Sequence, residues 1–169
     1  MLKSLRGQRV DQREDDPLSN DPKELREQLR KVEAERDSYK QMVDNMPVNV
    51  MTCNLEDFTI DYMNQATVRT LKEIENLLPV KVDELLGQSI DIFHKNPSHQ
   101  QRILADPSNF PHKAMITVGE EKLDLLVSAI RDNLGNYSAP MLTWSMVTDQ
   151  VRIANNVKEV VDIVASAAT

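Results

Sequence analysis

Two short stretches hold the side chains with the most distinctive chemistry in this 169-residue chain. Residues 90–100, Ile-Asp-Ile-Phe-His-Lys-Asn-Pro-Ser-His-Gln, contain His94 and His99, two of the three histidines, and residues 142–146 contain the only tryptophan, Trp144. A neutral imidazole can ligate a metal such as iron, and an indole N–H is purely a hydrogen-bond donor. If both kinds of side chain face one pocket, the imidazole can hold a metal-centred cofactor and the indole can donate a hydrogen bond to a polar ligand beside it. This is the chemistry of a gas or redox sensor.

The remaining reactive side chains fit structural roles better. Cys53 has no basic neighbour in the sequence to lower the pKa of its thiol, so we expect a buried structural thiol. His112 is expected to face solvent at the start of a strand. No serine, cysteine or carboxylate cluster resembles a catalytic constellation, so the chain is not expected to be an enzyme. The methionines expected to fill the core, and not to ligate a metal, are Met51, Met63, Met115, Met141 and Met146.

Composition excludes several classes of protein. The chain has 20 Lys and Arg against 27 Asp and Glu, a net charge of -7, which argues against a general nucleic-acid binder. It has no apolar run near the roughly 20 residues that span a bilayer and no signal peptide. With a single cysteine it can form no internal disulfide, and it lacks the C-x-x-C-H pattern of covalent haem attachment. We therefore expect a cytoplasmic protein with no membrane contact.

The N-terminal third is predicted to be a tail followed by a helix. Residues 1–20 are polar without an apolar period and are expected to be disordered. Asp21 and Pro22 suit the start of a helix that runs to about residue 46, before Pro47. A heptad spacing favours a two-stranded coiled coil over residues 21–46, although a single amphipathic helix lying on its own domain remains an alternative. The apolar seam consists of Leu25, Leu29, Val32, Tyr39, Val43 and Met46.

The rest of the chain is predicted to be one α+β domain over residues 47–149. Five β-prone runs and the helical stretches between the second and third of them indicate a five-stranded antiparallel sheet with short helices on one face. Residues 150–169 have a helical stripe and no stop signal, as expected for the start of a C-terminal signalling helix cut from something longer. The expected strands are 48–55, 58–64, 112–118, 122–131 and 137–148, and the expected helical stretches are 65–78, 83–86 and 88–106.

Strand alternation places the tryptophan on an apolar face of the predicted sheet. Successive side chains of a strand point to opposite faces, so two neighbouring strands each offer an apolar inner face. On one strand this face carries Leu142, Trp144 and Met146, and on the other it carries Leu123, Leu125, Val127 and Ala129. Any core needs such faces, so the pattern alone does not establish a ligand pocket.

This order of elements, with the 90–100 stretch and Trp144, resembles a PAS domain between signalling helices. More narrowly, the sequence is similar to the haem-binding PAS domains of soluble bacterial aerotaxis receptors, which belong to the methyl-accepting chemotaxis proteins. The similarity covers about residues 46–149, and residues 157–169 look like the first turns of a chemoreceptor signalling region. A PAS match alone carries little functional information, since the fold hosts many ligands. The Phe-His-Lys-Asn-Pro-x-His-Gln run is more specific.

The resemblance implies a site for b-type haem. In that family the histidine of the short helix before the Asn-Pro step ligates the iron, which here is His94, with Phe93 beside it. The strand tryptophan that contacts the distal ligand corresponds to Trp144, and the apolar residue that closes the distal pocket corresponds to Leu125. His99 competes with His94 as ligand, although a surface contact or a bond to a haem propionate suits it better. The indole N–H of Trp144 would favour dioxygen, which carries partial charge when bound, over carbon monoxide.

The implied function is a sensor of dioxygen or another diatomic gas in aerotaxis. The implied partners are the gas and a second copy of the chain joined through the flanking helices, with the chemotaxis kinase and adaptor reached only through a signalling region absent here. The pair Thr148 and Asp149 is expected to staple the last strand to the C-terminal helix. Two alternatives remain: a haem-free PAS module for dimerisation and signal relay, and a flavin-binding redox sensor of the same fold.

Overall fold

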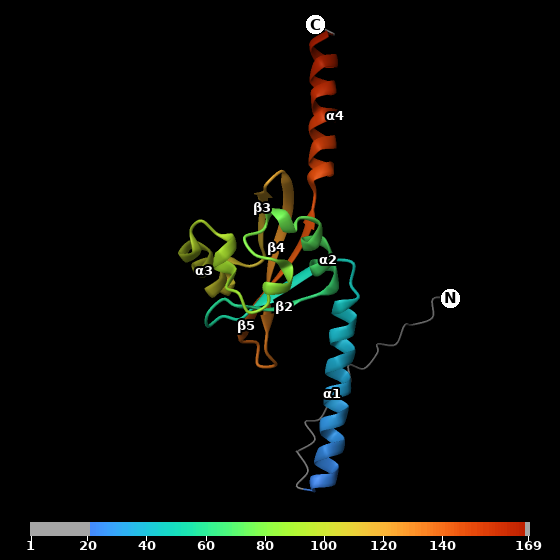
Figure 1. The fold of residues 1–169 in the computed structure, drawn as a ribbon, viewed down its shortest axis with the longest axis vertical. Coiled ribbons are helices and arrows are strands. Elements are labelled where there is room, and N and C mark those ends of the chain that lie inside the picture. Colours follow the sequence, from blue (N-terminus) through green and yellow to red (C-terminus); the bar gives the residue numbers. More distant parts are fainter. Residues whose placement is uncertain (1–20, 168–169) are drawn as a thin grey trace, which may run out of the picture. The chain divides into compact units, whose positions relative to one another are not determined.

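The computed structural model describes residues 21–167 (Figure 1). The disorder predicted for residues 1–20 therefore lies outside the described residues. The chain divides into two compact parts, one that ends at Lys40 and one that begins at Gln41. No helix within residues 21–167 combines the length and the hydropathy needed to cross a membrane.

The first helix, α1, spans Pro22–Asp44. Asp21 caps it, since its carboxylate accepts a hydrogen bond of 2.9 Å from the backbone N–H of Lys23. No residue of α1 is buried, and its apolar side chains are exposed, including Leu25, Leu29, Val32 and Tyr39. This helix covers nearly the range expected from the heptad spacing.

Five strands form a single antiparallel sheet in the order β2-β1-β5-β4-β3. The α+β fold class with five antiparallel strands is thus confirmed. The first hairpin is shorter than predicted, because residues 54–59 form its loop and only the flanking residues pair. The strands are β1 Asn49–Cys53, β2 Ile60–Met63, β3 His112–Val118, β4 Glu121–Arg131 and β5 Tyr137–Met146.

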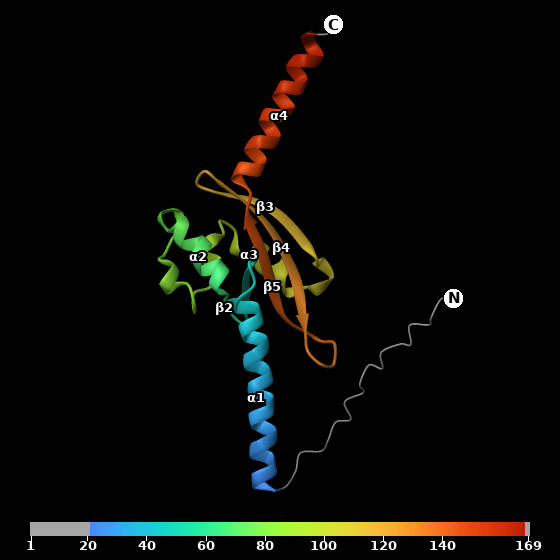
Figure 2. The ribbon, with the colours of Figure 1, turned by 90° about the vertical axis from the view of Figure 1, so that its right-hand side faces the viewer.

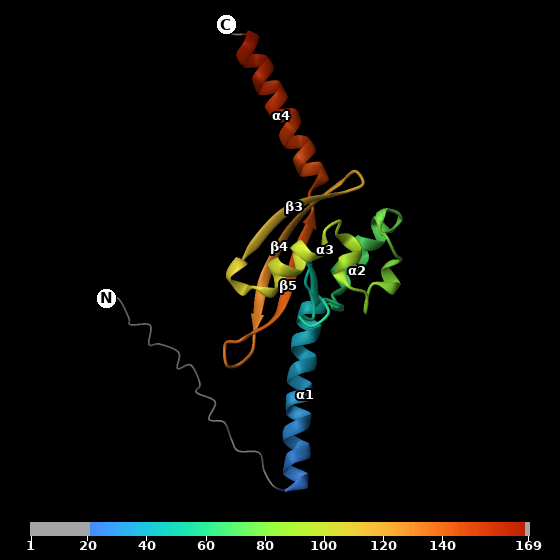
Figure 3. The ribbon, with the colours of Figure 1, turned by 90° about the vertical axis from the view of Figure 1, so that its left-hand side faces the viewer.

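The helical segments between β2 and β3 lie on one side of the sheet (Figures 2 and 3). Two of them are α-helices, α2 (Gln65–Glu73) and α3 (Pro97–Ala105). The others are single turns of 3₁₀-helix: η1 Glu75–Leu77, η2 Val82–Glu84, η3 Ile90–Phe93 and η4 Pro107–Asn109. This side of the sheet is called the inner face below.

The predicted helix over residues 65–78 is wrong in its end, because α2 stops at Glu73. The backbone N–H of Ile74 bonds to the carbonyl of Leu71, which tightens the chain into the 3₁₀ turn that follows. The carboxylate of Glu75 then accepts a hydrogen bond of 2.8 Å from the backbone N–H of Val82. That bond closes the loop between η1 and η2, and the helical periodicity of the sequence does not reveal it.

A tight turn joins β3 to β4 through Gly119 and Glu120. Gly119 has a φ of +59°, a conformation that side chains with a Cβ rarely adopt. A Cβ atom at this position would also lie 2.8 Å from Cδ2 of Leu77, so glycine is required by the close approach of η1 as well.

The core lies between the inner face and the helical segments. Its buried members come from β1, β2, β4, β5, α2 and the 3₁₀ region, so it joins both layers. They are Met51, Ile60, Leu71, Ile74, Val82, Leu85, Leu123 and Trp144. Met115, which the sequence assigned to the core, is instead exposed, because its side chain alternates to the other face of β3.

Asn64 is a fully buried amide that ties three elements together. Its Oδ1 accepts hydrogen bonds from the backbone N–H groups of Thr67 (2.9 Å) and Val50 (3.1 Å), which caps α2 and anchors β1. Its Nδ2 donates to the carbonyls of Val48 (2.8 Å) and Val43 (3.1 Å), the latter in the last turns of α1. Every hydrogen-bonding position of this amide is therefore used.

Replacing Asn64 with alanine should lower the free energy of unfolding by about 2–4 kcal/mol, since a helix cap is lost and buried backbone groups lose their partner. Urea denaturation measures this change. Asn45→Ala is the matched control, because the Asn45 side chain makes one exposed bond to the carbonyl of Gln41. Equal effects of the two substitutions would contradict the role assigned to Asn64.

Candidate functional site

The pairing of β4 with β5 brings Leu125 and Trp144 side by side. The two residues are direct cross-strand partners, and Asn49 of β1 pairs with Trp144 on the other side. Directly paired residues share a face, with Cβ atoms about 5 Å apart. The indole of Trp144 is thus flanked by Leu125 and Asn49 on the inner face, the face on which the sequence alternation expected it.

Trp144 is well buried and its polar atom is free. The residue is 5% exposed, and its indole N–H makes no hydrogen bond within residues 21–167. The neighbouring Leu125 and Leu142 on the same face are only half-buried, although they belong to the central strands of the sheet. The helical layer therefore covers this part of the inner face incompletely and leaves apolar side chains accessible beside a free donor.

The segment that carries His94 is anchored to the core just before the histidine. In η3, Ile90 and Ile92 pack against the buried cluster, and Ser89 caps the turn by accepting a hydrogen bond from the N–H of Asp91 (3.2 Å). His94 follows η3 instead of lying within it, and its side chain is half-buried. Phe93, the residue before His94, is 38% exposed.

The environment of His94 favours the neutral form of its imidazole. Burial lowers the pKa of this ring below its ordinary value, and the negative charge of Asp91 opposes the shift only in part. A neutral imidazole has a ring nitrogen with a lone pair, which is the form that ligates a metal. His94 thus has the protonation state that a ligand needs.

The other two histidines differ from each other in position. His99 lies in the first turn of α3 with an exposed side chain. His112 was expected to face solvent, but this prediction is wrong: it is half-buried and pairs with Val127, on the same inner face as Leu125. Alternation along residues 112–118 would have predicted the inner face for His112, because His112, Ala114 and Ile116 share one face.

Three contacts hold α3 and the segment after it to the rest of the domain. Gln101 donates a hydrogen bond of 2.9 Å from its Nε2 to Oδ2 of Asp91. The hydroxyl of Tyr137 donates to the carbonyl of Leu104 (2.7 Å), and the ring of Phe110 lies against the ring of Tyr137 with centroids 5.7 Å apart. These contacts join the wall that contains His94 to the beginning of β5.

Cys53 is buried in β1, as expected. Burial, reinforced by the charges of Asp61 and Asp57, raises the pKa of its thiol to about 12. A thiol that stays protonated at neutral pH is a poor metal ligand, so Cys53 serves packing.

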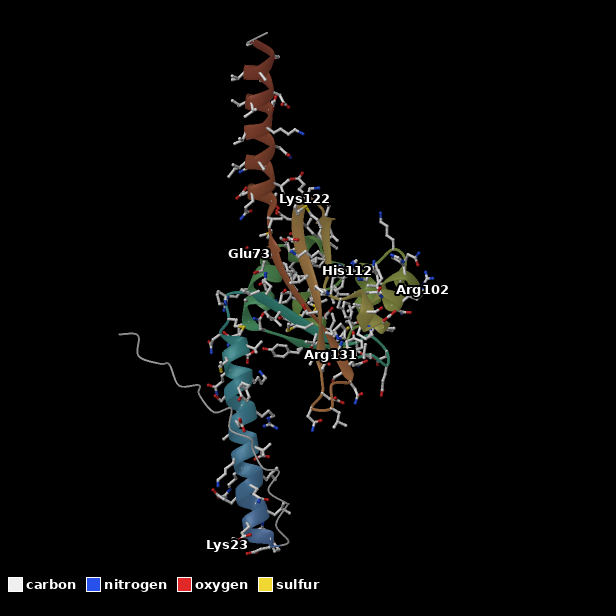
Figure 4. The ribbon with its side chains drawn as sticks, turned by 180° about the vertical axis from the view of Figure 1, so that it is seen from behind. Lys23, Glu73, Arg102, His112, Lys122 and Arg131 are labelled. Atoms are coloured by element: carbon white, nitrogen blue, oxygen red, sulfur yellow. The ribbon has the colours of Figure 1, made fainter. Side chains whose placement is uncertain are left out.

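A short cluster of hydrogen bonds joins the sheet to the last helix, α4 (Thr148–Ala167). The backbone N–H of Val147 donates to the carbonyl of Lys122 (2.8 Å), and the N–H of Lys122 donates to Oγ1 of Thr148 (2.9 Å). The hydroxyl of Thr148 donates to the carboxylate of Glu121. Figure 4 shows Lys122 at the end of the sheet where α4 begins, and Arg131 at the other end.

The staple predicted for Thr148 and Asp149 is made by Thr148. Asp149 is exposed and forms an ion pair of 2.9 Å with Arg152, one turn along α4. That pair stabilises the helix locally and does not reach the sheet, because the side chain of Asp149 points along the first turn.

Comparison with known proteins identifies the domain. No family model matches the sequence. The structure is similar to that of the Aer2 receptor from Vibrio cholerae, described as a dual PAS-heme oxygen sensor, with 37% sequence identity and a TM-score of 0.57. The similarity covers 60% of this chain and 95% of that one. The chain belongs to the PAS family of sensor domains.

Two further proteins are similar to this domain. The methyl-accepting chemotaxis protein McpB of Pseudomonas aeruginosa is 30% identical over 132 residues, which cover 75% of this chain. The chain spans only 19% of the length of McpB. An RNA-binding light-oxygen-voltage receptor shares the PAS fold at 13% identity, with a TM-score of 0.50 over 79% of this chain and 39% of that one.

Replacing Thr148 with valine should loosen the junction between the sheet and α4, since valine keeps the shape and removes the hydroxyl. The N–H of Lys122 then loses its acceptor, which should lower the free energy of unfolding by about 1 kcal/mol and speed amide exchange at Lys122 and in the first turn of α4. Hydrogen exchange followed by NMR measures both. Asp149→Ala is the control and should leave the exchange of Lys122 unchanged; a larger effect from Asp149→Ala would refute this assignment of the staple.

Proposed function

We propose that this PAS domain binds haem b and senses dioxygen or another diatomic gas as the input module of a cytoplasmic chemotaxis receptor. The relatives support both parts of the proposal: Aer2 of Vibrio cholerae is described as a PAS-heme oxygen sensor, and McpB is a methyl-accepting chemotaxis protein. The domain acts by binding and shape change, with no catalysed reaction.

The inner face suits a flat, largely apolar group. Leu125, Val127 and Leu142 lie in the two central strands on the helix-covered face, where a closed core would bury them, yet all three are only half-buried. A haem needs apolar surroundings to exclude water from its iron. The observation that most supports the proposal is the pairing of Leu125 with Trp144 on this face, where half-buried apolar side chains lie beside an indole N–H that has no partner within residues 21–167.

His94 is the proposed iron ligand, and Phe93 borders it. The half-buried imidazole is kept toward its neutral form, and the residues before it are fixed in the core. Within residues 21–167 no three His, Cys, Asp or Glu side chains gather as a metal site. A haem iron needs only one protein ligand, since the porphyrin supplies the other four, so this finding does not bear on His94.

His112 and His99 are not the proposed iron ligands. His112 lies on β3, the edge strand of the sheet, and faces the inner side. His99 is exposed at the start of α3, where a surface contact or a bond to a carboxylate suits it better than metal ligation.

A haem held by one imidazole would supply an iron that can bind a diatomic gas. Trp144 would provide a hydrogen-bond donor to that gas, and Leu125 would limit the space around it. A hydrogen bond to a partly charged acceptor contributes about 1.5–3 kcal/mol, or about tenfold to a hundredfold in affinity. This donor therefore favours dioxygen over carbon monoxide, whose bound form accepts such bonds weakly.

The proposed signal passes from the site to α4 along β5, the strand that carries Trp144. β5 continues through Val147 to Thr148, whose hydrogen bonds couple the start of α4 to β4. A displacement of Trp144 therefore reaches α4 through one strand. Ligand binding then biases two packings of the flanking helices in a homodimer, the bistable element that a switch needs. The exposed apolar side chains of α4 that favour such a dimer are Val157, Val160, Val161 and Val164.

Adding hemin to the purified protein should produce a Soret absorption band that saturates at one haem per chain. His94→Ala should abolish the high-affinity band, and His99→Ala, the matched histidine control, should leave it within about threefold of the wild-type affinity. Loss of the band only in His99→Ala would move the ligand to α3. A wild type without a Soret band would leave the haem-free dimerisation module, and one that instead absorbs near about 450 nm would indicate a flavin.

Replacing Trp144 with phenylalanine keeps an aromatic ring and removes the N–H donor. The dissociation rate of dioxygen should rise about tenfold to a hundredfold, whereas that of carbon monoxide should change by less than about threefold. Stopped-flow displacement and flash photolysis measure the two rates. Equal changes for the two gases would mean that Trp144 acts through packing alone.

A further inference from the structure

Asp91 occupies a constrained position in η3, three residues before His94. Its backbone N–H donates to Oγ of Ser89 (3.2 Å), and its carbonyl accepts from the N–H of His94 (3.0 Å). Its Oδ2 accepts the hydrogen bond of 2.9 Å from Nε2 of Gln101. The carboxyl group is therefore fixed between η3 and α3.

The second carboxyl oxygen of Asp91 is an exception among the buried polar atoms. Oδ1 is shut off from solvent and has no hydrogen-bond partner within the described part of the chain. A buried acceptor without a partner costs about 1–3 kcal/mol, and more for a charged group. Such an atom in a native fold calls for a functional explanation.

A donor that could satisfy Oδ1 belongs to His94. The hydrogen bond from the N–H of His94 to the carbonyl of Asp91 closes a 3₁₀ turn and keeps the two residues together. The charge of Asp91 also acts on the imidazole of His94. A hydrogen bond from a ring N–H of His94 would give Oδ1 the partner that it lacks.

We propose that Asp91 is a positioning residue for His94: Oδ1 accepts a hydrogen bond from one ring N–H, which fixes the tautomer and leaves the other ring nitrogen to hold iron. The proposal rests on the haem-binding function above, yet the Asp91–His94 bond itself can be tested without haem. Metal-ligating histidines usually donate their second N–H to a carboxylate or carbonyl, which orients the ring and raises its basicity. Gln101 would hold the carboxylate in place for this role.

The first test uses the haem-free protein. In the wild type, long-range ¹H–¹⁵N NMR spectra should show His94 in one tautomer with a slowly exchanging ring N–H. Asp91→Ala should give a mixture of tautomers and loss of that N–H signal. Asp106→Ala is the control: it removes a carboxylate that caps another 3₁₀ turn of the same layer, η4, so His94 should keep one tautomer. An unchanged His94 in Asp91→Ala would overturn the proposal.

If Asp91→Ala does not fold, Asp91→Asn serves instead, since it keeps the shape of the side chain and removes its charge. The ring N–H of His94 should then exchange at least about tenfold faster than in the wild type, because hydrogen bonds to charged acceptors are roughly twice as strong as neutral ones. Exchange at the wild-type rate would overturn the proposal.

The second test measures haem loss to a scavenging apoglobin. Asp91→Ala should release haem about tenfold to a hundredfold faster than the wild type, the usual effect of removing a partner of a metal-ligating side chain. Asp106→Ala should change the rate by less than about threefold. Haem release at the wild-type rate from Asp91→Ala would overturn the proposal, whereas a wild type that binds no haem would refute the proposed function and leave the NMR result to decide the Asp91–His94 bond.

Discussion

The register between β4 and β5 is the constraint on which the proposed site depends. Because side chains alternate along a strand, the pairing of Leu125 with Trp144 puts both on the inner face, and a slip of one strand by one residue would turn the side chains of that strand to the other face. The register is fixed at one end by the turn around Gly135 and at the other by the bonds that Lys122 makes to Val147 and Thr148. The same hydrogen bonds that set the face of Trp144 thus also set the start of α4.

The two walls of the site are built differently. The sheet wall is a continuous ladder of backbone hydrogen bonds, whereas the facing wall consists of single 3₁₀ turns and one short helix. Short 3₁₀ segments have few internal bonds, so this wall depends on individual contacts such as Gln101 with Asp91 and Tyr137 with Leu104. A sensor benefits from this division: the compliant wall can adapt to a bound group, and the rigid strand can pass a displacement to α4.

The sequence predicted the parts of this fold that local patterns determine. Alternation placed Trp144 and Leu125 on apolar inner faces of the sheet, because it depends only on residues close in the sequence. It missed the early end of α2, since the bond between Glu75 and Val82 joins separate turns. It also missed the buried amide of Asn64, whose four bonds reach three elements.

At the site itself, the sequence and its resemblance to a family named His94, His99, Phe93, Leu125 and Trp144, whose roles remain predictions. Asp91 escaped notice because an aspartate in a turn is common, and only the fold reveals that its Oδ1 is buried without a partner. His112 was assigned to solvent from the proline before it, although strand alternation would have put it on the inner face. The pattern within one strand can thus be read from the sequence, whereas contacts between side chains of different segments cannot.

The proposed binding of haem against the inner face beside Trp144 can be measured directly, because the chain has a single tryptophan. Ferric haem is paramagnetic and broadens nearby NMR signals, and the chain has one indole N–H resonance. One equivalent of hemin should erase that resonance and the methyl signals of Leu125, while the diamagnetic gallium porphyrin should only shift them. Methyl signals of Met115, exposed on the other face, should persist. An indole resonance that stays sharp at one equivalent of bound hemin would contradict the account.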